Sequence, residues 1–524
     1  KWAVRLTAWM HSPDDADSLT CLRRGSPASI SITLTRSTRL TLTRSFALTG
    51  LCEPLGGKNI WNSLKAVDAQ RRIVMAVATF DSSAFFHDLA FGANADASGL
   101  VALLGAIEAL AKVDLAQLKR QIIFAIFTAE SWGYIGSRSF VKDISNFLCY
   151  SGMIDSLERC ACMQVSLVSL TLSLSLSLSH SATLDPSRCN EPLRTSTAFQ
   201  QLKLDMIDSI VNVEQVGQSS SAAVPELFIH QDPTVKNASD IVHAITLSAS
   251  LVRLVTLMLF ALSITVLTRL APLLYQSGIK ASTISDQTEI PPSSLMSFFR
   301  KTKDISGIVL SDYAREYTNK YANPIVAGVR SLAHSLTHTH ACVYVYRFYH
   351  SQYDDASNVN MSAICAASNT LARSLYLLAL DDQSAVTASQ INEIAVDCDT
   401  VAQFFHCLVV DTNCTLFHKF SGSSSSKVDL PPPSRYTSVY SRHRVALLSK
   451  FIYDWISYQT SPFRSIKKCD DHSQCKDKRA PACLAGVCVA PGYSFFHDAY
   501  SPAFELIGGE WRIVDKTESL WTES

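Results

Sequence analysis

The sequence lacks an excess of charge of either sign, and it has few charged residues. Its 524 residues contain 46 lysines and arginines against 46 aspartates and glutamates, and 18% of all residues are charged. The balance removes any electrostatic case for binding nucleic acid, and the low charged fraction disfavours long disorder. The chain also lacks a clean signal peptide and does not begin with methionine, so we expect its true start to lie upstream.

Some stretches are of low complexity. Ser166–Ser179 alternates serine and leucine, as a translated CT dinucleotide repeat does, and Thr337–His340 reads THTH, as a CA repeat would encode. The run Leu254–Thr268 is uncharged and apolar but falls short of the ~20 residues of a membrane-spanning helix. We hypothesise that parts of the chain are translated intron or gene-model error, a hypothesis that the mature transcript can disprove. The suspected stretches are 1–48, 146–195, 248–273 and 323–347.

Cysteine is abundant, with fifteen residues. That number is high for a cytosolic enzyme and odd, which indicates either an oxidising compartment with at least one unpaired thiol or a chain that is not intact. Four cysteines cluster in the segment 465–492 with the spacing C-x5-C-x7-C-x4-C, wider than the pairs that zinc sites use. We therefore expect disulfides there, with the pairing left open. The four residues are Cys469, Cys475, Cys483 and Cys488.

Three sequons are acceptors for N-linked glycans if the chain enters the secretory pathway. They stand at Asn237, Asn360 and Asn413. Together with the cysteines, they support a lumenal domain.

The region 49–524 has the pattern of a globular domain. Arg72–Thr79 and Gln121–Thr128 are short apolar runs typical of buried strands, and Gly92–Lys112 between them has helical spacing. Strand, helix and strand in this order predict a parallel α/β sheet. Further along, Ser306–Ser311 is expected to be a strand and Met361–Leu380 a long helix.

Three carboxylates stand where a parallel sheet carries its sites. Asp81 and Glu130 follow the two expected strands, and Asp96 lies at the start of the helix between them. Sites in such sheets lie beyond the carboxyl ends of the strands. The alternative is that these residues are caps and turns, which for Asp96 alone is the favoured interpretation.

Two of these segments carry a family resemblance. Glu130–Ser137 (ESWGYIGS) and Phe91–Gly99 (FGANADASG) resemble the metal-site segments of co-catalytic zinc aminopeptidases and of their non-catalytic relatives, the nicastrin family. The resemblance implies an α/β fold like that of the zinc aminopeptidases, with a mixed, largely parallel sheet, flanking helices and irregular insertions. The late cysteine cluster suggests a plant-like member. Further segments that resemble nicastrin are Leu51–Leu64, Phe80–Phe86, Met206–Gly217, Ile290–Asp312, Tyr500–Glu505 and Ser519–Ser524.

The resemblance also allows the metal ligands to be counted. The peptidases hold two zinc ions with two histidines, two aspartates and one glutamate. Three of these positions are degraded, because Thr79 replaces a histidine, Ala95 the bridging aspartate (with Asp96 one residue late) and Ser131 the glutamate. At most two donors then remain for each metal, fewer than the three of catalytic zinc. We expect no metal, no cofactor and no catalytic residue. The matching positions are Glu130 for the general base, Asp208 (less well Asp205) for the second aspartate and His350 for the last histidine.

The resemblance implies a non-catalytic ectodomain of γ-secretase that recognises or sterically screens substrates and stabilises the complex. Its partners would be presenilin and the other subunits, and its substrates the stubs of type I membrane proteins. The ectodomain would be lumenal or extracellular in a secretory-pathway membrane (endoplasmic reticulum, Golgi, plasma membrane or endosome), anchored by a helix beyond Ser524. The alternatives are a zinc-dependent aminopeptidase or carboxypeptidase of the same fold and a free secreted binding module; bound zinc would discriminate the peptidase.

Glu130 is the candidate to pair with the amino terminus of a substrate. Its alternative is a buried carboxylate satisfied by backbone amides. Gly133 stands where the family has aspartate, and Gly136–Ser137 would equally well begin the next helix. The candidates for substrate recognition are Glu130, Trp132, Tyr134, Asp208 and His350, with Gly133, Ile135, Gly136 and Ser137 completing the motif.

Overall fold

The computed structural model describes most of the chain from Glu53 to Glu523. Of the stretches suspected of not belonging to the protein, 1–48 and 323–347 lie outside the described residues. So does 146–195 apart from Asn146, and so does 248–273 beyond Phe260. The described ranges are 53–146, 202–218, 225–260, 279–284, 289–315, 349–380, 387–421, 433–441, 444–490, 492–507 and 510–523.

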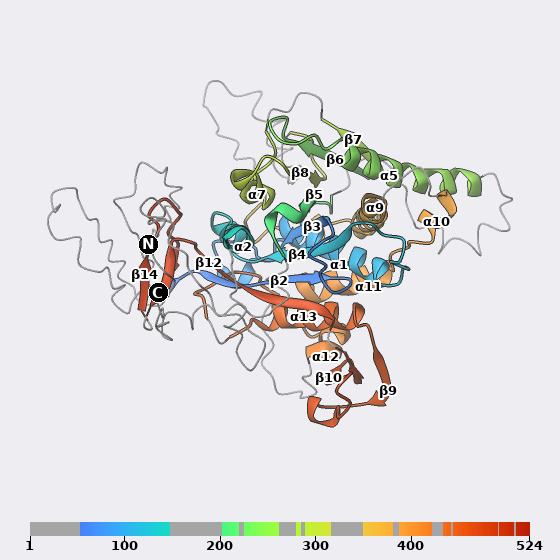
Figure 1. The fold of residues 1–524 in the computed structure, drawn as a ribbon. Coiled ribbons are helices and arrows are strands. Elements are labelled where there is room, and N and C mark those ends of the chain that lie inside the picture. Colours follow the sequence, from blue (N-terminus) through green and yellow to red (C-terminus); the bar gives the residue numbers. More distant parts are fainter. Residues whose placement is uncertain are drawn as a thin grey trace, which may run out of the picture.

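An eight-stranded mixed sheet forms the centre of the molecule (Figure 1), in the order β12-β2-β4-β3-β5-β8-β6-β7. The four strands β4, β3, β5 and β8 are mutually parallel, and the antiparallel strands flank them. This confirms the expected mixed, largely parallel α/β sheet. The strands are β2 (Gly56–Ser63), β3 (Ile73–Thr79), β4 (Gln121–Phe127), β5 (Ile207–Val213), β6 (Glu226–Gln231), β7 (Lys280–Thr283), β8 (Ser306–Ser311) and β12 (Tyr493–Tyr500).

Helices cover both faces of the sheet, because its central strands are apolar on both sides. One core gathers residues of α1 (Ser98–Leu110), α5 (Ser239–Phe260), α9 (Met361–Ala379), α11 (Cys398–Phe405), α12 (Thr415–Ser421) and α13 (Leu447–Gln459). The opposite core is built by α2 (Ile135–Asn146) and α7 (Leu295–Lys301). Successive residues of β3 enter the two cores in turn, as the two-residue period of a strand requires.

The elements predicted from periodicity are confirmed. The two apolar runs are β3 and β4, and the helix between them is α1, preceded by a π-helical turn, Ala93–Ala97. The later strand and long helix are β8 and α9.

One described helical stretch, Ala93–Leu110, is long and apolar enough to cross a membrane by length and composition, and it is wholly buried inside the protein. It is the central helix of the larger core. The apolar run Leu254–Thr268 overlaps α5 as far as Phe260, and the rest of it lies outside the described residues.

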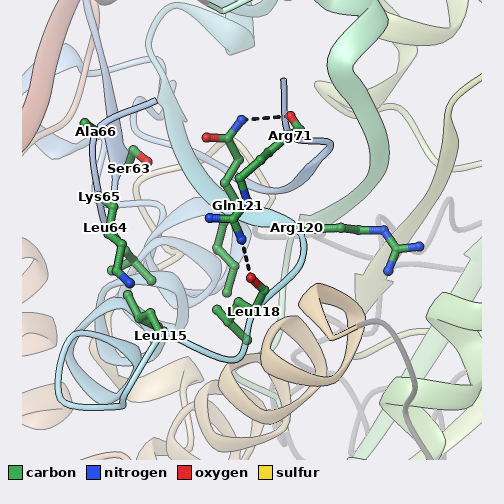
Figure 2. A pocket seen from close by; sticks show the side chains of 10 residues that line it. Ser63, Leu64, Lys65, Ala66, Arg71, Leu115, Leu118, Arg120 and Gln121 are labelled. Carbon is green, nitrogen blue, oxygen red and sulfur yellow. Dashed lines mark hydrogen bonds between the residues drawn. The ribbon is translucent and has the colours of Figure 1, made fainter. Parts of the chain in front are cut away.

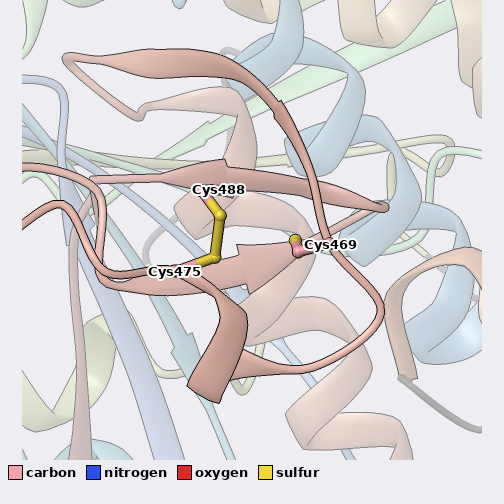
Figure 3. Close-up of side chains that lie close together, drawn as sticks. All are labelled: Cys469, Cys475 and Cys488. Atoms are coloured by element: carbon pink, nitrogen blue, oxygen red, sulfur yellow. A yellow bond between two sulfur atoms is a disulfide. The ribbon is translucent and has the colours of Figure 1, made fainter.

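The cysteine-rich segment forms a three-stranded sheet of its own, at the lower right of Figure 1. Its strands are β9 (Arg464–Lys468), β10 (Ala482–Leu484) and β11 (Val487–Val489). The structure supplies the pairing that the sequence left open, Cys469–Cys483 and Cys475–Cys488. Figure 3 shows the second of these disulfides, with Cys469 close to it. Two further disulfides join Cys365 to Cys398 and Cys407 to Cys414.

Candidate functional site

Three carboxylates line the edge where β3, β4 and β5 end. Asp81 follows β3, Glu130 follows β4 and Glu214 follows β5. Because the three strands are adjacent and parallel, their carboxyl ends meet at one edge of the sheet. The sequence analysis missed Glu214, although it comes directly after the last residue of a buried strand, as the other two nearly do.

The Asp81 carboxylate organises the loop after β4. It accepts hydrogen bonds from the backbone N–H of Glu130 (2.8 Å) and of Ser131 (3.1 Å). The side chain is fully buried, and this desolvation raises the pKa of Asp81 to about 6 despite both hydrogen bonds. Asp81 therefore fixes the backbone that carries the next carboxylate.

Glu130 is held on both of its oxygens. One accepts from the backbone N–H of Ser137 (2.8 Å), in the first turn of α2, and the other from the hydroxyl of Ser294 (2.5 Å). The side chain is 4% exposed, and burial raises the pKa of Glu130 to about 7. This is a buried carboxylate satisfied by a backbone amide and a hydroxyl, close to the alternative considered from the sequence.

The π-helical turn Ala93–Ala97 brings Asp96 to the same place. The turn is capped by Asp354, which accepts from the backbone N–H groups of Asn94 (3.0 Å) and Ala95 (2.9 Å). Asp96 is buried, and one of its carboxylate oxygens has no close hydrogen-bond partner among the residues that the structure describes. Desolvation raises the pKa of Asp96 to about 7, and the positive charge of Arg435 partly opposes that shift.

Glu214 and His350 complete the acidic cluster. Glu214 accepts from the Asn212 amide (2.6 Å), and desolvation, with repulsion from Asp96 and Glu130, raises its pKa to about 8. His350 has a left-handed backbone (φ 54°) and stacks on Tyr349. Its imidazole is near enough to Asp81 and Asp354 to be attracted by them, but desolvation lowers its pKa. The structure thus brings His350 to the cluster.

Asp208 is not brought there. It lies at the start of β5, and a seven-residue strand separates that end from Glu214 by about 20 Å. Its carboxylate binds Lys236 (2.8 Å), Arg120 (3.2 Å) and Arg72 (3.6 Å), which lower its pKa. Asp205, in the turn before β5, belongs to this end too. At the same amino-terminal end of the sheet, a small pocket is lined by residues around Gln121 and Arg120 (Figure 2).

The motif Trp132–Ser137 forms a left-handed turn and the start of α2. Gly133 has a φ of 73° and Tyr134 a φ of 62°, and α2 begins at Ile135. Gly136 and Ser137 therefore lie in the first turn of that helix, as the alternative from the sequence expected. Trp132 packs against Trp521 (ring centroids 5.5 Å apart).

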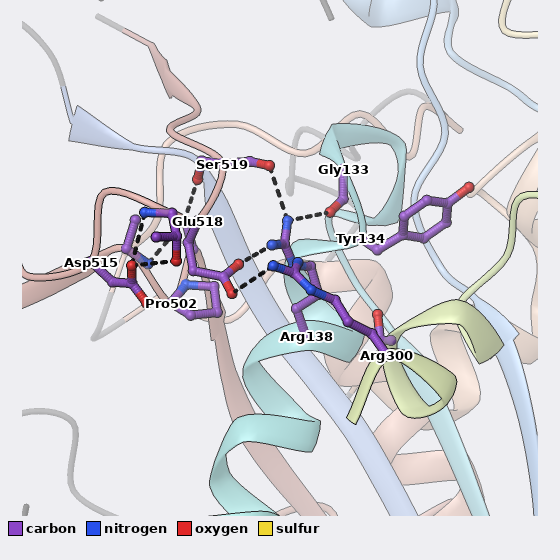
Figure 4. Close-up of polar contacts among 12 residues, drawn as sticks. Gly133, Tyr134, Arg138, Arg300, Pro502, Asp515, Glu518 and Ser519 are labelled. Carbon is purple, nitrogen blue, oxygen red and sulfur yellow. Dashed lines mark hydrogen bonds and ion pairs between the residues drawn. The ribbon is translucent and has the colours of Figure 1, made fainter. Parts of the chain in front are cut away.

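The C-terminal segment is fastened over this turn. Arg138 of α2 forms an ion pair with Glu518 and donates to the hydroxyl of Ser519 (3.0 Å) and the carbonyl of Gly133 (3.4 Å). Figure 4 shows this cluster, with the Tyr134 ring pointing away from it. The last strand, β15 (Thr522–Glu523), pairs with β1 (Glu53–Pro54).

The residues present do not fit a zinc site of the peptidase type. Thr79, Ala95 and Ser131 offer no zinc ligand of that set, and the oxygens of Glu130 are committed to hydrogen bonds. Within the described ranges, one group of three His, Cys, Asp or Glu ligand atoms converges closely enough to hold a metal. It consists of Cys469, Cys475 and Cys488, whose sulfurs are in disulfides.

Comparison with known proteins agrees with this fold. The family model "Nicastrin large lobe" matches residues 72–260 and 267–337. The chain belongs to the nicastrin family. Nicastrin from Arabidopsis thaliana is 27% identical over 91% of the chain and 60% of its own length, and the chain spans about 57–63% of its curated nicastrin relatives.

A solved nicastrin structure has the same fold. The crystal structure of nicastrin, described as a gamma-secretase component, superposes with a TM-score of 0.64 at 23% identity, over 91% of this chain and 67% of that one. A zinc aminopeptidase from Bacillus subtilis matches 63% of this chain and 52% of its own, with a TM-score of 0.33 at 15% identity.

Proposed function

We propose that the chain is a non-catalytic ectodomain of a γ-secretase complex, which recognises or screens substrates and stabilises the assembly. The proposal rests on membership of the nicastrin family, because the solved relative is described as a gamma-secretase component. Presenilin and the other subunits are then the partners, and the stubs of type I membrane proteins are the substrates.

The observation that carries the non-catalytic role is the state of Glu130. In peptidases of the zinc type, the general base acts on a metal-bound water. Here both oxygens of Glu130 accept hydrogen bonds from Ser137 and Ser294, and within the described part of the chain the neighbouring carboxylates do not converge on a common ligand point. The peptidase alternative lacks both the ligand set and a free base.

Zinc content tests this part directly. The full chain, purified from a eukaryotic secretory host and dialysed against zinc, should retain far less than one zinc ion per chain by atomic absorption. It should also leave aminopeptidase and carboxypeptidase substrates uncleaved. Two tightly held zinc ions, or cleavage abolished by a chelator, would overturn the non-catalytic role.

An exposed apolar surface beside the cluster supports the recognition role. Phe85 is 54% exposed, Phe86 52% and Leu89 40%. They flank His87, which stacks on Tyr436 with ring centroids 3.6 Å apart, and Tyr436 in turn meets the edge of the Trp132 ring. Exposed aromatic side chains next to a rigid turn are typical of protein-contact surfaces. The substrate stub would lie on this surface, with Glu130 fixing the turn below it through its bonds to Ser137 and Ser294.

Glu130→Gln separates recognition from assembly, since it keeps the shape of the side chain. In cells that lack the endogenous subunit, the full-length protein carrying this change should still co-purify with presenilin and should lower cleavage of a short-stub substrate. Asp208→Asn, at the opposite end of the sheet, is the matched control and should change neither. Loss of co-purification by Glu130→Gln would make Glu130 a structural residue, and unchanged cleavage would remove it from recognition.

Glycosylation would place the domain in a secretory-pathway lumen. Asn237, Asn360 and Asn413 are all exposed. Asn360 also caps α9 by accepting from Ser362, a bond that leaves its amide nitrogen for a glycan. Glycosidase treatment of the protein from membranes should remove mass at these asparagines. A chain without glycans in intact secretory membranes would contradict this localisation.

A further inference from the structure

A buried arginine lies within the acidic cluster, and none of the roles above uses it. Arg435 is 1% exposed, and its positive charge interacts with the carboxylates of Asp96, Asp354 and Asp81. Those three side chains are themselves buried. An arginine remains charged even in such surroundings, although desolvation lowers its pKa.

Arg435 comes from an extended strap, residues 433–441, that crosses the carboxyl edge of the sheet. The strap is held by backbone hydrogen bonds, from the N–H of Arg435 to the carbonyl of Ala90 and from the N–H of Ser82 to the carbonyl of Arg435 (both 3.0 Å). Farther along it, the N–H of Tyr440 donates to the carbonyl of Pro54 (2.8 Å). The strap therefore presents Arg435 at a fixed position.

The guanidinium is oriented by backbone carbonyls around the cluster. It donates to the carbonyl oxygens of Phe80 (3.2 Å), Phe91 and Gly92 (2.8 Å). Position 92 requires glycine, because its φ of 50° is left-handed and a Cβ there would lie 2.2 Å from the Ser82 hydroxyl and 2.6 Å from a carboxylate oxygen of Asp96. These carbonyls belong to the loops that carry Asp81 and Asp96, so the Arg435 guanidinium links the two loops.

Among the described residues, two buried polar atoms of opposite charge have no close hydrogen-bond partner at this place, although the Ser82 hydroxyl also stabilises the Asp96 carboxylate. They are Oδ2 of Asp96 and Nε of Arg435. Their side chains attract each other through space. Because a buried carboxylate without a compensating charge is costly, this attraction is an energetic requirement of the site.

We propose that Arg435 is a fixed internal cation, which balances the carboxylates of Asp96, Asp354 and Asp81 as metal ions do in the peptidases that the sequence resembles. It also fastens the strap over the carboxyl edge. The acidic cluster is thus kept in a chain that has lost the zinc ligands. This goes beyond the proposed function, because it concerns what balances the buried charge whatever the chain binds.

A double-mutant cycle tests the charge balance. Asp96 is the suitable partner, since Asp354 and Asp81 also accept backbone hydrogen bonds whose loss would confuse the result. Arg435→Met should lower the thermal midpoint of the purified full chain by roughly 5–10 °C at pH 8. Asp96→Asn should then raise the midpoint of Arg435→Met by several degrees more than it changes that of the wild type. Equal shifts in the two backgrounds would overturn the proposal.

Arg373 provides the matched control. It is also buried and donates to a backbone carbonyl, that of Ile394 (3.0 Å), but desolvation is the sole cause of its lowered pKa, about 10. Asp96→Asn should therefore shift the midpoint of Arg373→Met as it shifts the wild type.

A second pair of variants covers the case in which Arg435→Met does not fold. Lysine and glutamine at position 435 can both donate hydrogen bonds, but lysine alone keeps the charge. Arg435→Lys should have a higher thermal midpoint and secreted yield than Arg435→Gln. If Arg435→Gln has a thermal midpoint equal to or above that of Arg435→Lys, the hydrogen bonds of Arg435 stabilise the site and its charge does not.

Discussion

The two ends of the parallel strands treat carboxylates in opposite ways. At the carboxyl end, Asp81, Asp96 and Glu130 are buried together, and desolvation raises their pKa values. At the amino end, Asp208 is partly exposed among three cations, which lower its pKa. Burial therefore favours the neutral form of the carboxyl group at one end, and nearby cations favour its anion at the other. The difference lies in burial and in the number of cations nearby.

Removing one carboxylate from each end should give the largest difference in stability between the two ends. Asp81→Ala removes the acceptor of the buried N–H of Glu130 and of the partly buried N–H of Ser131, and should lower the free energy of unfolding by about 2–4 kcal/mol. Asp208→Ala breaks ion pairs of a partly exposed residue and should cost about 1 kcal/mol or less. Denaturant unfolding of the purified chain measures both. Similar losses for the two variants would contradict the difference between the ends.

The pH dependence of stability sharpens the comparison. Glu130 has a raised pKa of about 7, so the folded state holds a proton that the unfolded state has already released above pH 5. The stability due to this group is therefore fully present below its ordinary pKa, near 4.5, and is lost as the pH rises through about 7. The wild type should be more stable at pH 5 than at pH 8, and Glu130→Gln should remove about 2 kcal/mol of that difference.

Asp208→Asn is the control for the pH experiment. The lowered pKa of Asp208 means that its stabilising contribution is present above its ordinary pKa and is lost only in more acidic solution. Between pH 5 and pH 8 this variant should keep the slope of the wild type. If Glu130→Gln also keeps that slope, the raised pKa of Glu130 is refuted.

The sequence predicted the buried elements well, because strands covered on both faces read as continuous apolar runs. It also placed Asp81 and Glu130 correctly at the ends of β3 and β4. It matched Asp208 to the site by resemblance, although that residue begins β5, and it passed over Glu214, which follows β5. Arg435 could not be predicted, since it lies 355 residues from Phe80, whose carbonyl it binds, and comes from a strap without regular periodicity.

The two ends should also differ in how their stability depends on salt, although the expected change in unfolding free energy is smaller. Lys236 is half-exposed, and its ion pair with Asp208 is open to screening, whereas the contacts of Asp81 are buried hydrogen bonds. Lys236→Ala should lower the free energy of unfolding by about 0.5 kcal/mol at low ionic strength, and this loss should vanish in about 1 M salt. The loss caused by Asp81→Ala should be unchanged by salt. A salt-independent effect of Lys236→Ala would mean that its packing, and not its charge, stabilises the amino end.

The smallest expected net effect is that of Gly133→Asp, which adds a carboxylate to the rim of the acidic end. A Cβ at Gly133 would lie 3.0 Å from Nε1 of Trp521, a buried N–H without a hydrogen-bond partner in the described part of the chain. Gly133→Ala should cost about 1 kcal/mol, because the residue has a left-handed backbone. Gly133→Asp should recover most of that loss, since aspartate tolerates this conformation better and its carboxylate can accept from the indole. Unfolding of the two variants side by side measures the difference, and an aspartate variant no more stable than the alanine variant would show that the indole N–H does not reach the new carboxylate.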